Sequence, residues 1–518
     1  MSATLTPTRP QPASPFASTN PEPRWSDETR PPDAARSEAI VAALREILPA
    51  HCVLAGVEQT RPYECDGLSA LRQLPVAVVL PETEAQVIEV LKRCHALDVP
   101  VVARGAGTSL SGGSTPHAAG IVLSLARMNR ILHLDPLART ARVQPGVRNL
   151  AISEAAAPHG LYYAPDPSSQ IACSIGGNLA ENSGGVHCLK YGLTVHNVLR
   201  IRGITIEGEV LELGGTALDT PGLDLLALAI GSEGMLLVVT EATVRLIPKP
   251  QQARVVMASF DSVIRAGDAV AAIIAAGIIP AGLEMMDRKA TEAVEPFVKA
   301  GYDLEAEAIL LAESDGTPEE VEEEIARMEA VLREAGSTRI AVSGSEAERL
   351  RFWSGRKNAF PAAGRISPDY YCMDGTIPRK NLGRMLSAIA DMERQYGLRC
   401  MNVFHAGDGN LHPLILFDAN TPGEWERADR FGADILELCV ELGGTVTGEH
   451  GVGLEKINSM CVQFSPAERR AFFAIKRAFD PPGLLNPGKG IPTLARCAEY
   501  GKMHVQCGRI SFPELPRF

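Results

Sequence analysis

Two histidines and a glutamate in the last quarter of the chain have the residue types of a catalytic metal site. The histidines flank Asp408-Gly409, a pair typical of a two-residue hairpin turn, because both central positions of that turn need positive φ. With the turn centred there, His405 is predicted to face His412. Directly opposed residues of an antiparallel pair project from one face, with Cβ atoms roughly 5 Å apart, so the two imidazoles are expected to converge.

A third ligand is available in the glycine-flanked loop over residues 448–451, where the backbone can approach a site closely. This ligand is Glu449. Two histidines and one carboxylate leave coordination positions open, as catalytic metal sites do, and Zn, Mn and Fe all suit the set. The alternative is that His405 and His412 form a surface cross-strand pair and that Glu449 is a solvated loop charge.

Length, charge and cysteine content narrow the class of protein. At 518 residues the chain is too long for one ordinary core, so two or three domains and a tail are expected. The net charge of −12 argues against a nucleic-acid partner, and no apolar run reaches the length that spans a bilayer. The 11 cysteines include no C-x-x-C pair, which argues against an iron–sulfur cluster held by this chain alone. With no signal peptide, we expect a cytoplasmic protein whose membrane attachment, if any, is peripheral and through partners.

The first part of the chain leads into a candidate phosphate-binding loop. Residues 1–36 hold eight prolines and are predicted to be a disordered tail. A strand over 76–80, a helix opened by a Thr83–Gln86 capping box and a strand over 99–103 form a β-α-β unit. It ends in residues 104–113, whose Gly, Ser and Thr residues offer N–H groups and hydroxyls to phosphate oxygens. The loop is neither a nicotinamide-type dinucleotide fingerprint nor a P-loop.

Two further glycine-rich stretches follow in the same region. Residues 165–168 and 174–185 form the second, and residues 231–234, before a strand over 235–240, form the third. The segments between the first two are expected to form three strands and a helix: 121–125, 131–134, 140–143 and 147–158.

Beyond residue 248 the pattern becomes that of an α+β substrate domain. Strands are expected over 254–259 and 308–313, and helices over 264–276, 318–335, 425–442 and 467–479.

In this order, the motifs resemble the flavin-linked oxidases with a vanillyl-alcohol-oxidase-type, or PCMH-type, FAD domain. The paired histidines with Glu449-His450 resemble the D-2-hydroxy-acid dehydrogenase branch, and the match is close at 353–360, 369–375 and 486–489. The resemblance covers nearly the whole chain. It implies an α+β fold with a two-part FAD-binding domain (37–249), an α+β substrate domain with an antiparallel sheet (250–425) and a helical C-terminal cap that returns to the flavin (426–518).

The resemblance implies FAD, with its pyrophosphate on residues 104–113 and its isoalloxazine near 165–185. Family members that attach flavin covalently use a histidine in the first loop, which this loop lacks, so the FAD is expected to be non-covalent. The residues implied to bind it are Arg104, Gly105, Gly107, Thr108, Ser109, Gly112, Gly113, Pro165, Asp166, Ser168, Gly176, Gly177, Asn178, Ser183, Gly184, Gly185, Glu233 and Asn486.

The resemblance also implies catalytic roles. His450 is the implied general base, since imidazole titrates near working pH. Arg356 can hold a substrate carboxylate through two hydrogen bonds, although Arg351 and Lys357 lie close by and a helical arginine is often a solvated charge. Asn410 assists the substrate or only stabilises the turn. A divalent metal on the three ligands would stabilise the substrate alkoxide as a Lewis acid.

The expected activity is FAD-dependent oxidation of a 2-hydroxy acid, glycolate or D-lactate, by hydride transfer to the flavin. Without clustered cysteines, electrons must leave through another protein, so we expect a hetero-oligomer with a second flavin-type subunit and an iron–sulfur subunit. The alternatives are a stand-alone D-lactate or other D-2-hydroxy-acid dehydrogenase and a non-catalytic flavin-binding accessory subunit. Retention of His405, His412, Glu449 and His450 argues against the last. A mononuclear iron oxygenase would use similar ligands but has no use for two FAD loops.

Overall fold

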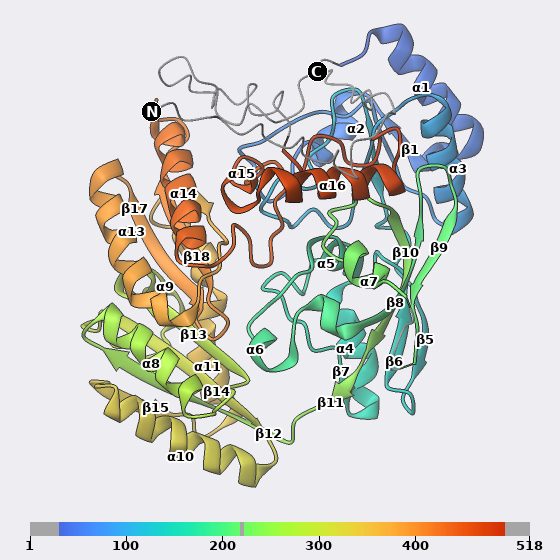
Figure 1. Cartoon of the computed structure of the whole chain (residues 1–518). Coiled ribbons are helices and arrows are strands. Elements are labelled where there is room, and N and C mark those ends of the chain that lie inside the picture. The colour runs from blue at the N-terminus through green and yellow to red at the C-terminus, as the bar shows by residue number, and fades with distance from the viewer. Residues whose placement is uncertain (1–30, 218–221, 493–518) are drawn as a thin grey trace, which may run out of the picture.

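The computed structural model describes residues 31–217 and 222–492, in two parts joined through β11 and β12 (Figure 1). Most of the predicted tail and residues 493–518 of the predicted cap lie outside the described residues. The first helix, α1 (Ala34–Ile47), begins before the predicted boundary at residue 37. The helix begins this early because Asp33 caps its N-terminus: the Asp33 side chain accepts a hydrogen bond from the Arg36 N–H.

A small mixed sheet carries the first glycine-rich loop. Its strands run in the order β1 (Val53–Ala55), β2 (Ala77–Val79), β4 (Ile121–Ser124) and β3 (Val101–Arg104). β2, β4 and β3 are parallel, and α3 (Glu84–Ala96) makes the crossover. This helix starts where the Thr83 hydroxyl accepts from the Gln86 N–H, as the capping box predicts. The loop therefore leaves the sheet at the carboxyl end of a buried strand.

The second sheet of the N-terminal part is antiparallel. Its order is β5 (Ile131–Asp135), β6 (Thr140–Val143), β10 (Val238–Arg245), β8 (Val198–Ile204) and β9 (Val210–Gly214). Three helices share its core: α4 (Asn149–Ala156), α5 (Ile175–Glu181) and α7 (Leu225–Ala229). The strand expected over 235–240 is β10, which begins three residues later. A short ladder of β7 (Leu161–Tyr162) and β11 (Ile247–Pro248) lies where the chain passes to the C-terminal part.

The C-terminal part is built on a seven-stranded antiparallel sheet. Its order is β15 (Arg339–Val342), β12 (Gln252–Phe260), β14 (Ala308–Gly316), β13 (Gly282–Asp287), β17 (Arg399–His405), β18 (Asn410–Phe417) and β16 (Asp369–Cys372). One face packs on α8 (Val263–Ala275), α10 (Pro318–Glu334), α13 (Leu382–Tyr396) and α14 (Glu424–Glu441). The other packs on α9 (Arg288–Val298), α11 (Glu346–Lys357) and α12 (Ala359–Ala363).

Alternation along the strands decides which side chains reach the α11 face. On β17, Phe404 belongs to the core under α13, whereas Met401 and Val403 belong to the core under α9, α11 and α12. Because successive side chains point to opposite faces, His405 lies on the α11 face. The same parity places Glu284 of β13 and His412 of β18 there. Three polar groups from three strands therefore share one face.

The described residues from α14 to residue 492 divide between the two parts. We expected α14 in the C-terminal cap, but Phe431, Ile435 and Cys439 bury its apolar stripe in the core of the seven-stranded sheet. The cap proper is α15 (Met460–Gln463) and α16 (Pro466–Phe479), which lie over the N-terminal part (Figure 1). The segment after α16 returns to the first sheet, where Leu485 bridges Val101 in parallel. None of the helices in the described ranges is long and apolar enough to cross a membrane.

Candidate active site

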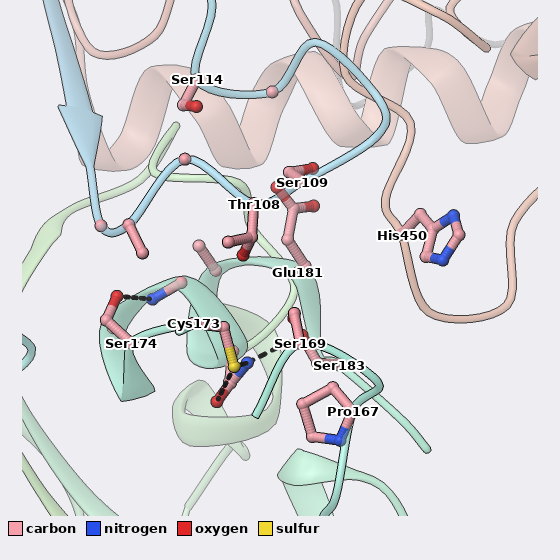
Figure 2. Close-up of a pocket in the computed structure, with 18 of the residues that line it drawn as sticks. Thr108, Ser109, Ser114, Pro167, Ser169, Cys173, Ser174, Glu181, Ser183 and His450 are labelled. Atoms are coloured by element: carbon pink, nitrogen blue, oxygen red, sulfur yellow. Dashed lines mark hydrogen bonds between the residues drawn. The ribbon is translucent and has the colours of Figure 1, made fainter. Parts of the chain in front are cut away.

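A cavity of about 530 Å³ lies between the two parts of the molecule (Figure 2). The N-terminal part lines it with all three glycine-rich stretches, and the C-terminal part with α11, α12 and the loop that follows Gly448. Figure 2 shows Thr108, Ser109 and Glu181 together on one wall, with His450 on a separate loop. The cavity is thus shared by a polar N-terminal wall and a histidine-bearing C-terminal wall.

The first loop is held against the second by close packing. A Cβ on Gly105 would collide with the Ser174 hydroxyl, so only glycine permits this approach. Arg104 folds beneath its own loop, donating to the Cys65 carbonyl at 2.7 Å and lying over the Tyr63 ring. Burial lowers the pKa of Arg104. Its guanidinium supports the loop from below.

The second stretch contains a helix that the sequence reasoning missed. α5 begins at Ser174, whose hydroxyl accepts from the Gly177 N–H. The capping residue type was visible, but glycines at positions 176 and 177 disfavour a helix interior, so a loop was the natural interpretation. Ser174, Glu181 and Ser114 line the cavity and were not among the predicted residues.

Many of the residues implied to bind FAD do line the cavity. They are Arg104, Gly105, Gly107, Thr108, Ser109, Gly113, Ser168, Gly176, Gly177, Asn178, Ser183 and Glu233.

Six further residues implied to bind FAD do not line the cavity: Gly112, Pro165, Asp166, Gly184, Gly185 and Asn486. Asp166 accepts from the ring and backbone of His187, at 2.7 and 3.1 Å. Asn486 donates to the carbonyls of Gly113 and Glu233, and so ties the C-terminal segment to the first loop. These two polar side chains are occupied by protein groups.

The histidine hairpin forms with a different register from the one predicted. His405 pairs with Asn410, and His412 pairs with Val403. Of the two turn residues, only Gly409 has positive φ, at 81°, so the primed two-residue turn does not form and a longer loop joins the strands. A Cβ on Gly409 would also collide with the Ile377 carbonyl.

The two histidines still converge as predicted. The observed register differs from the predicted one by two residues, and because side chains alternate with a period of two along a strand, both histidines stay on the same face. The rings of His405 and His412 lie 5.0 Å apart, nearly perpendicular. Glu449 Oε1 lies 3.2 Å from His405 Nε2 and 3.1 Å from His412 Nε2. All three residues are buried, and their ligand atoms lie within 4.8 Å of one another.

The polar atoms of this cluster that make no hydrogen bond are suited to bind a cation. Neither ring nitrogen of His412 makes a hydrogen bond within the described part of the chain, although the Glu449 carboxylate is so near. Ligand atoms about 2.0–2.2 Å from a tetrahedral ion lie roughly 3.3–3.6 Å apart, close to the observed separations. The donor set and its spacing therefore suit a divalent metal.

Burial and charge set the protonation of the cluster. Burial lowers the pKa of His412 to about 4, which keeps it neutral. Burial also lowers the pKa of His405, but the neighbouring carboxylates of Glu284 and Glu449 have the larger effect and hold this pKa well above its usual range. Burial raises the pKa of Glu449, but its two histidine neighbours pull it well below the usual value. Glu449 is thus an anion beside one neutral and one charge-stabilised imidazole.

The Glu449 loop is held by a buried carboxylate that the sequence reasoning did not single out. Asp374 is fully buried and accepts from the N–H groups of Glu449 and His450, at 3.1 and 2.8 Å, and from the Thr447 hydroxyl at 2.6 Å. His450 itself lines the cavity, and its Nδ1 is buried without a hydrogen bond among the described residues.

The two remaining candidates differ in position. Arg356 is 2% exposed, lines the cavity, and donates from Nε to Glu284 at 2.6 Å, so it is not the solvated helical charge of the alternative interpretation. Asn410 does not line the cavity. It lies against Gly448, where a Cβ would collide with the Asn410 amide. That contact favours support of the loop over contact with a substrate.

The rest of the cavity suits a polar cofactor. The Ser114 hydroxyl and Glu181 Oε2 are buried on its wall without a hydrogen bond in the described residues. Burial, reinforced by the neighbouring Glu233 carboxylate, raises the pKa of Glu181 well above its usual value, so it can donate a hydrogen bond. These donors and the glycine loops fit FAD.

Comparisons with known proteins agree with this architecture. Residues 75–214 match the family described as "FAD binding domain", and residues 249–490 match "FAD linked oxidases, C-terminal domain". The fold is similar to that of p-cresol methylhydroxylase with substrate bound, with a TM-score of 0.75 and 19% identity over 89% of this chain and 98% of that one. The predicted α+β fold with a vanillyl-alcohol-oxidase-type FAD domain is confirmed.

The chain belongs to the FAD-linked oxidases, and FAD is its cofactor. It is 63% identical to glycolate oxidase subunit GlcD of Escherichia coli K12, over 94% of this chain and 97% of that one. It is 39% identical to the GlcD subunit of Bacillus subtilis, over 82% and 91%. It is also 32% identical to a D-lactate dehydrogenase of Archaeoglobus fulgidus, over 80% and 91%.

Proposed function

We propose that this chain oxidises glycolate, and D-lactate less well, to the corresponding 2-oxo acid. The observation that carries the proposal is the convergence of His405, His412 and Glu449 beside a cavity that the FAD loops line. The names of the relatives, glycolate oxidase subunit and D-lactate dehydrogenase, support the same substrate class. When bound, FAD accepts the hydride from the substrate Cα.

His405, His412 and Glu449 would hold a divalent cation, Zn²⁺, Mn²⁺ or Fe²⁺. When bound, it supplies Lewis-acid stabilisation of the developing alkoxide. The neutral state of His412 leaves a lone pair for this role. The protein keeps the ligands dry, since all three side chains are buried.

Two side chains act directly on the substrate. The Arg356 guanidinium, anchored through Nε, presents its terminal nitrogens to the substrate carboxylate. His450 takes the hydroxyl proton at Nδ1, which has no other hydrogen-bonding partner among the described residues. The Asp374 carboxylate holds the His450 backbone and so fixes where the ring enters the cavity.

The electrons leave through partner proteins. The E. coli and B. subtilis relatives are named as subunits, which supports a hetero-oligomer. We assign this chain a second flavin-type subunit and an iron–sulfur subunit as partners, with quinone rather than O₂ as the final acceptor and any membrane attachment peripheral. FAD is dissociable, because no histidine stands in the first loop over residues 104–113.

The visible spectrum of the purified chain under anaerobic conditions tests the proposal. Glycolate is expected to bleach the oxidised flavin, and D-lactate to bleach it more slowly. Bleaching is expected to disappear in His450→Ala and after treatment with a chelator, and to return when Zn²⁺ or Mn²⁺ is restored.

Other spectra would select an alternative. Faster bleaching by D-lactate than by glycolate would favour a D-lactate dehydrogenase. A bound flavin that neither acid bleaches, even in the assembled hetero-oligomer, would favour the accessory-subunit function and contradict the proposal.

A further inference from the structure

Glu284 is a charged residue in the middle of an apolar strand. It is 1% exposed on β13, between Leu283 and Met285 of the sheet core. Taking an unpaired carboxylate out of water costs several kcal/mol, so a residue at this position requires strong partners. Glu284 has two such partners, and both belong to the proposed substrate site.

Each oxygen of Glu284 has its own partner. Oε1 lies 2.7 Å from His405 Nδ1, and Oε2 accepts from Arg356 Nε at 2.6 Å. His405 and Arg356 come from a strand and a helix 49 residues apart in the chain, and Arg356 is as buried as Glu284. One carboxylate therefore joins the proposed metal ligand to the proposed carboxylate anchor.

We propose that Glu284 is a positioning residue for both sides of the substrate. By accepting the Nδ1–H of His405, it keeps one ring proton on Nδ1, so that Nε2 is the nitrogen that gives up its proton and offers a lone pair to a metal, as carboxylates that accept from metal-bound histidines do. By accepting from Arg356 Nε, it holds the guanidinium on the cavity wall, where Nη2 lies 3.4 Å from His405 Nδ1. The inference rests on the proposed function, because it assigns the metal and the substrate carboxylate to these groups.

A carboxylate is required because both partners are donors. In Glu284→Gln the side chain keeps its shape, but one of its two heteroatoms becomes an NH₂ group. Either His405 Nδ1–H or Arg356 Nε–H then meets another donor. The first outcome weakens metal binding, and the second releases the guanidinium and raises the KM for glycolate.

The chain offers a matched control on the next strand. Glu313 of β14 is 2% exposed, on the same face of the sheet, and also joins an arginine of α11, Arg349 at 2.7 Å, to a histidine, His187 at 3.2 Å. None of these three lines the cavity. Glu313→Gln therefore removes an equivalent buried charge away from the proposed site.

The test is the affinity of the FAD-loaded, metal-stripped full chain for Mn²⁺, measured from the EPR signal of free Mn²⁺. Glu284→Gln is expected to bind Mn²⁺ about 10–100-fold more weakly than the wild type. Glu313→Gln is expected to bind like the wild type while melting at a lower temperature. If Glu284 only stabilised the fold, both variants would melt earlier and both would keep the wild-type affinity.

The outcomes separate this inference from the proposed function. A folded Glu284→Gln that keeps both the wild-type Mn²⁺ affinity and the wild-type KM for glycolate overturns the inference alone. A wild-type chain that binds no Mn²⁺, Zn²⁺ or Fe²⁺ overturns the proposed metal site and the inference with it.

If Glu284→Gln does not fold, Glu284→Leu with Arg356→Met replaces the ion pair by apolar groups, a change that buried pairs often tolerate. That double variant leaves His405 without its acceptor and is expected to lose Mn²⁺ affinity as well.

Discussion

Two Glu–Arg–His groups, each centred on a buried glutamate, lie under the same helix of the C-terminal part. The first is Glu284 with Arg356 and His405, and the second is Glu313 with Arg349 and His187. The two arginines stand seven residues apart on α11, which is nearly two helical turns, so they project from the same face of the helix. The two glutamates come from neighbouring antiparallel strands. The chemical components are therefore the same.

The histidines of the two groups differ in what surrounds them. Both ring nitrogens of His187 meet carboxylates, Asp166 at 2.7 Å and Glu313 at 3.2 Å, and the group ties the N-terminal part to the sheet. His405 also meets two carboxylates, but its second one, Glu449, is shared with His412, whose own nitrogens make no hydrogen bond in the described chain. A group in which every ring nitrogen has a hydrogen-bonding partner is suited to join domains. A group that includes ring nitrogens without a partner is suited to bind a cation.

The largest expected effect separates the two histidines. In His405→Ala the proposed metal site loses a ligand, so bleaching of the flavin by glycolate is expected to slow by about 10³-fold, since Lewis-acid stabilisation contributes several kcal/mol. In His187→Ala the bleaching rate is expected to stay within a few-fold of the wild type, while the melting temperature falls. Stopped-flow absorbance and thermal melting of the FAD-loaded chain measure the two effects. Equal loss of rate in both variants would mean that the two groups do not differ in function.

The sequence predicts the convergence of His405, His412 and Glu449 better than it predicts the residues that hold them in place. His405, His412 and Glu449 stand in recognisable motifs, and parity along the strands brings the histidines to one face even though the predicted register was wrong. Glu284 carries no such signal, because it is a single charge in an apolar strand and its partner lies 121 residues away. Burial of a charge depends on long-range pairing, which local patterns do not reveal.

Asp166 shows the opposite error. The family resemblance implies a cofactor contact for Asp166, which stands in the second glycine-rich stretch. Its carboxylate instead accepts from the ring and the backbone N–H of His187. The two residues lie 21 positions apart, across α5, a helix that the sequence did not predict. Without that helix, nothing in the sequence brings them together.

The next effect separates the two arginines. Arg356→Lys keeps the charge but loses the planar set of donors, so the KM for glycolate is expected to rise about 10–100-fold, which corresponds to the loss of one or two charge-assisted hydrogen bonds. Arg349→Lys is expected to leave the KM unchanged and to lower the free energy of unfolding by about 1–2 kcal/mol. Steady-state kinetics and urea unfolding give the two numbers. A KM that rises equally in both variants would show that α11 acts as a unit and that Arg356 has no separate contact with the substrate.

The smallest expected effect is the pH dependence of the second group. Burial lowers the pKa of His187, but Asp166 and Glu313 outweigh it and hold the pKa well above its usual range. A histidine whose folded-state pKa is raised contributes stability that is full below its unfolded pKa, about 6.5, and that is lost as pH rises through the raised value. His187→Gln is therefore expected to destabilise the chain by about 2 kcal/mol at pH 6, with the difference from the wild type shrinking as the pH becomes alkaline. The control is His133→Gln at an exposed position of β5, measured by urea unfolding over the same pH range. A deficit in His187→Gln that stays constant with pH would show that His187 acts there as a neutral hydrogen-bonding group, and the contrast with His405 would then rest on the unmet atoms of His412 alone.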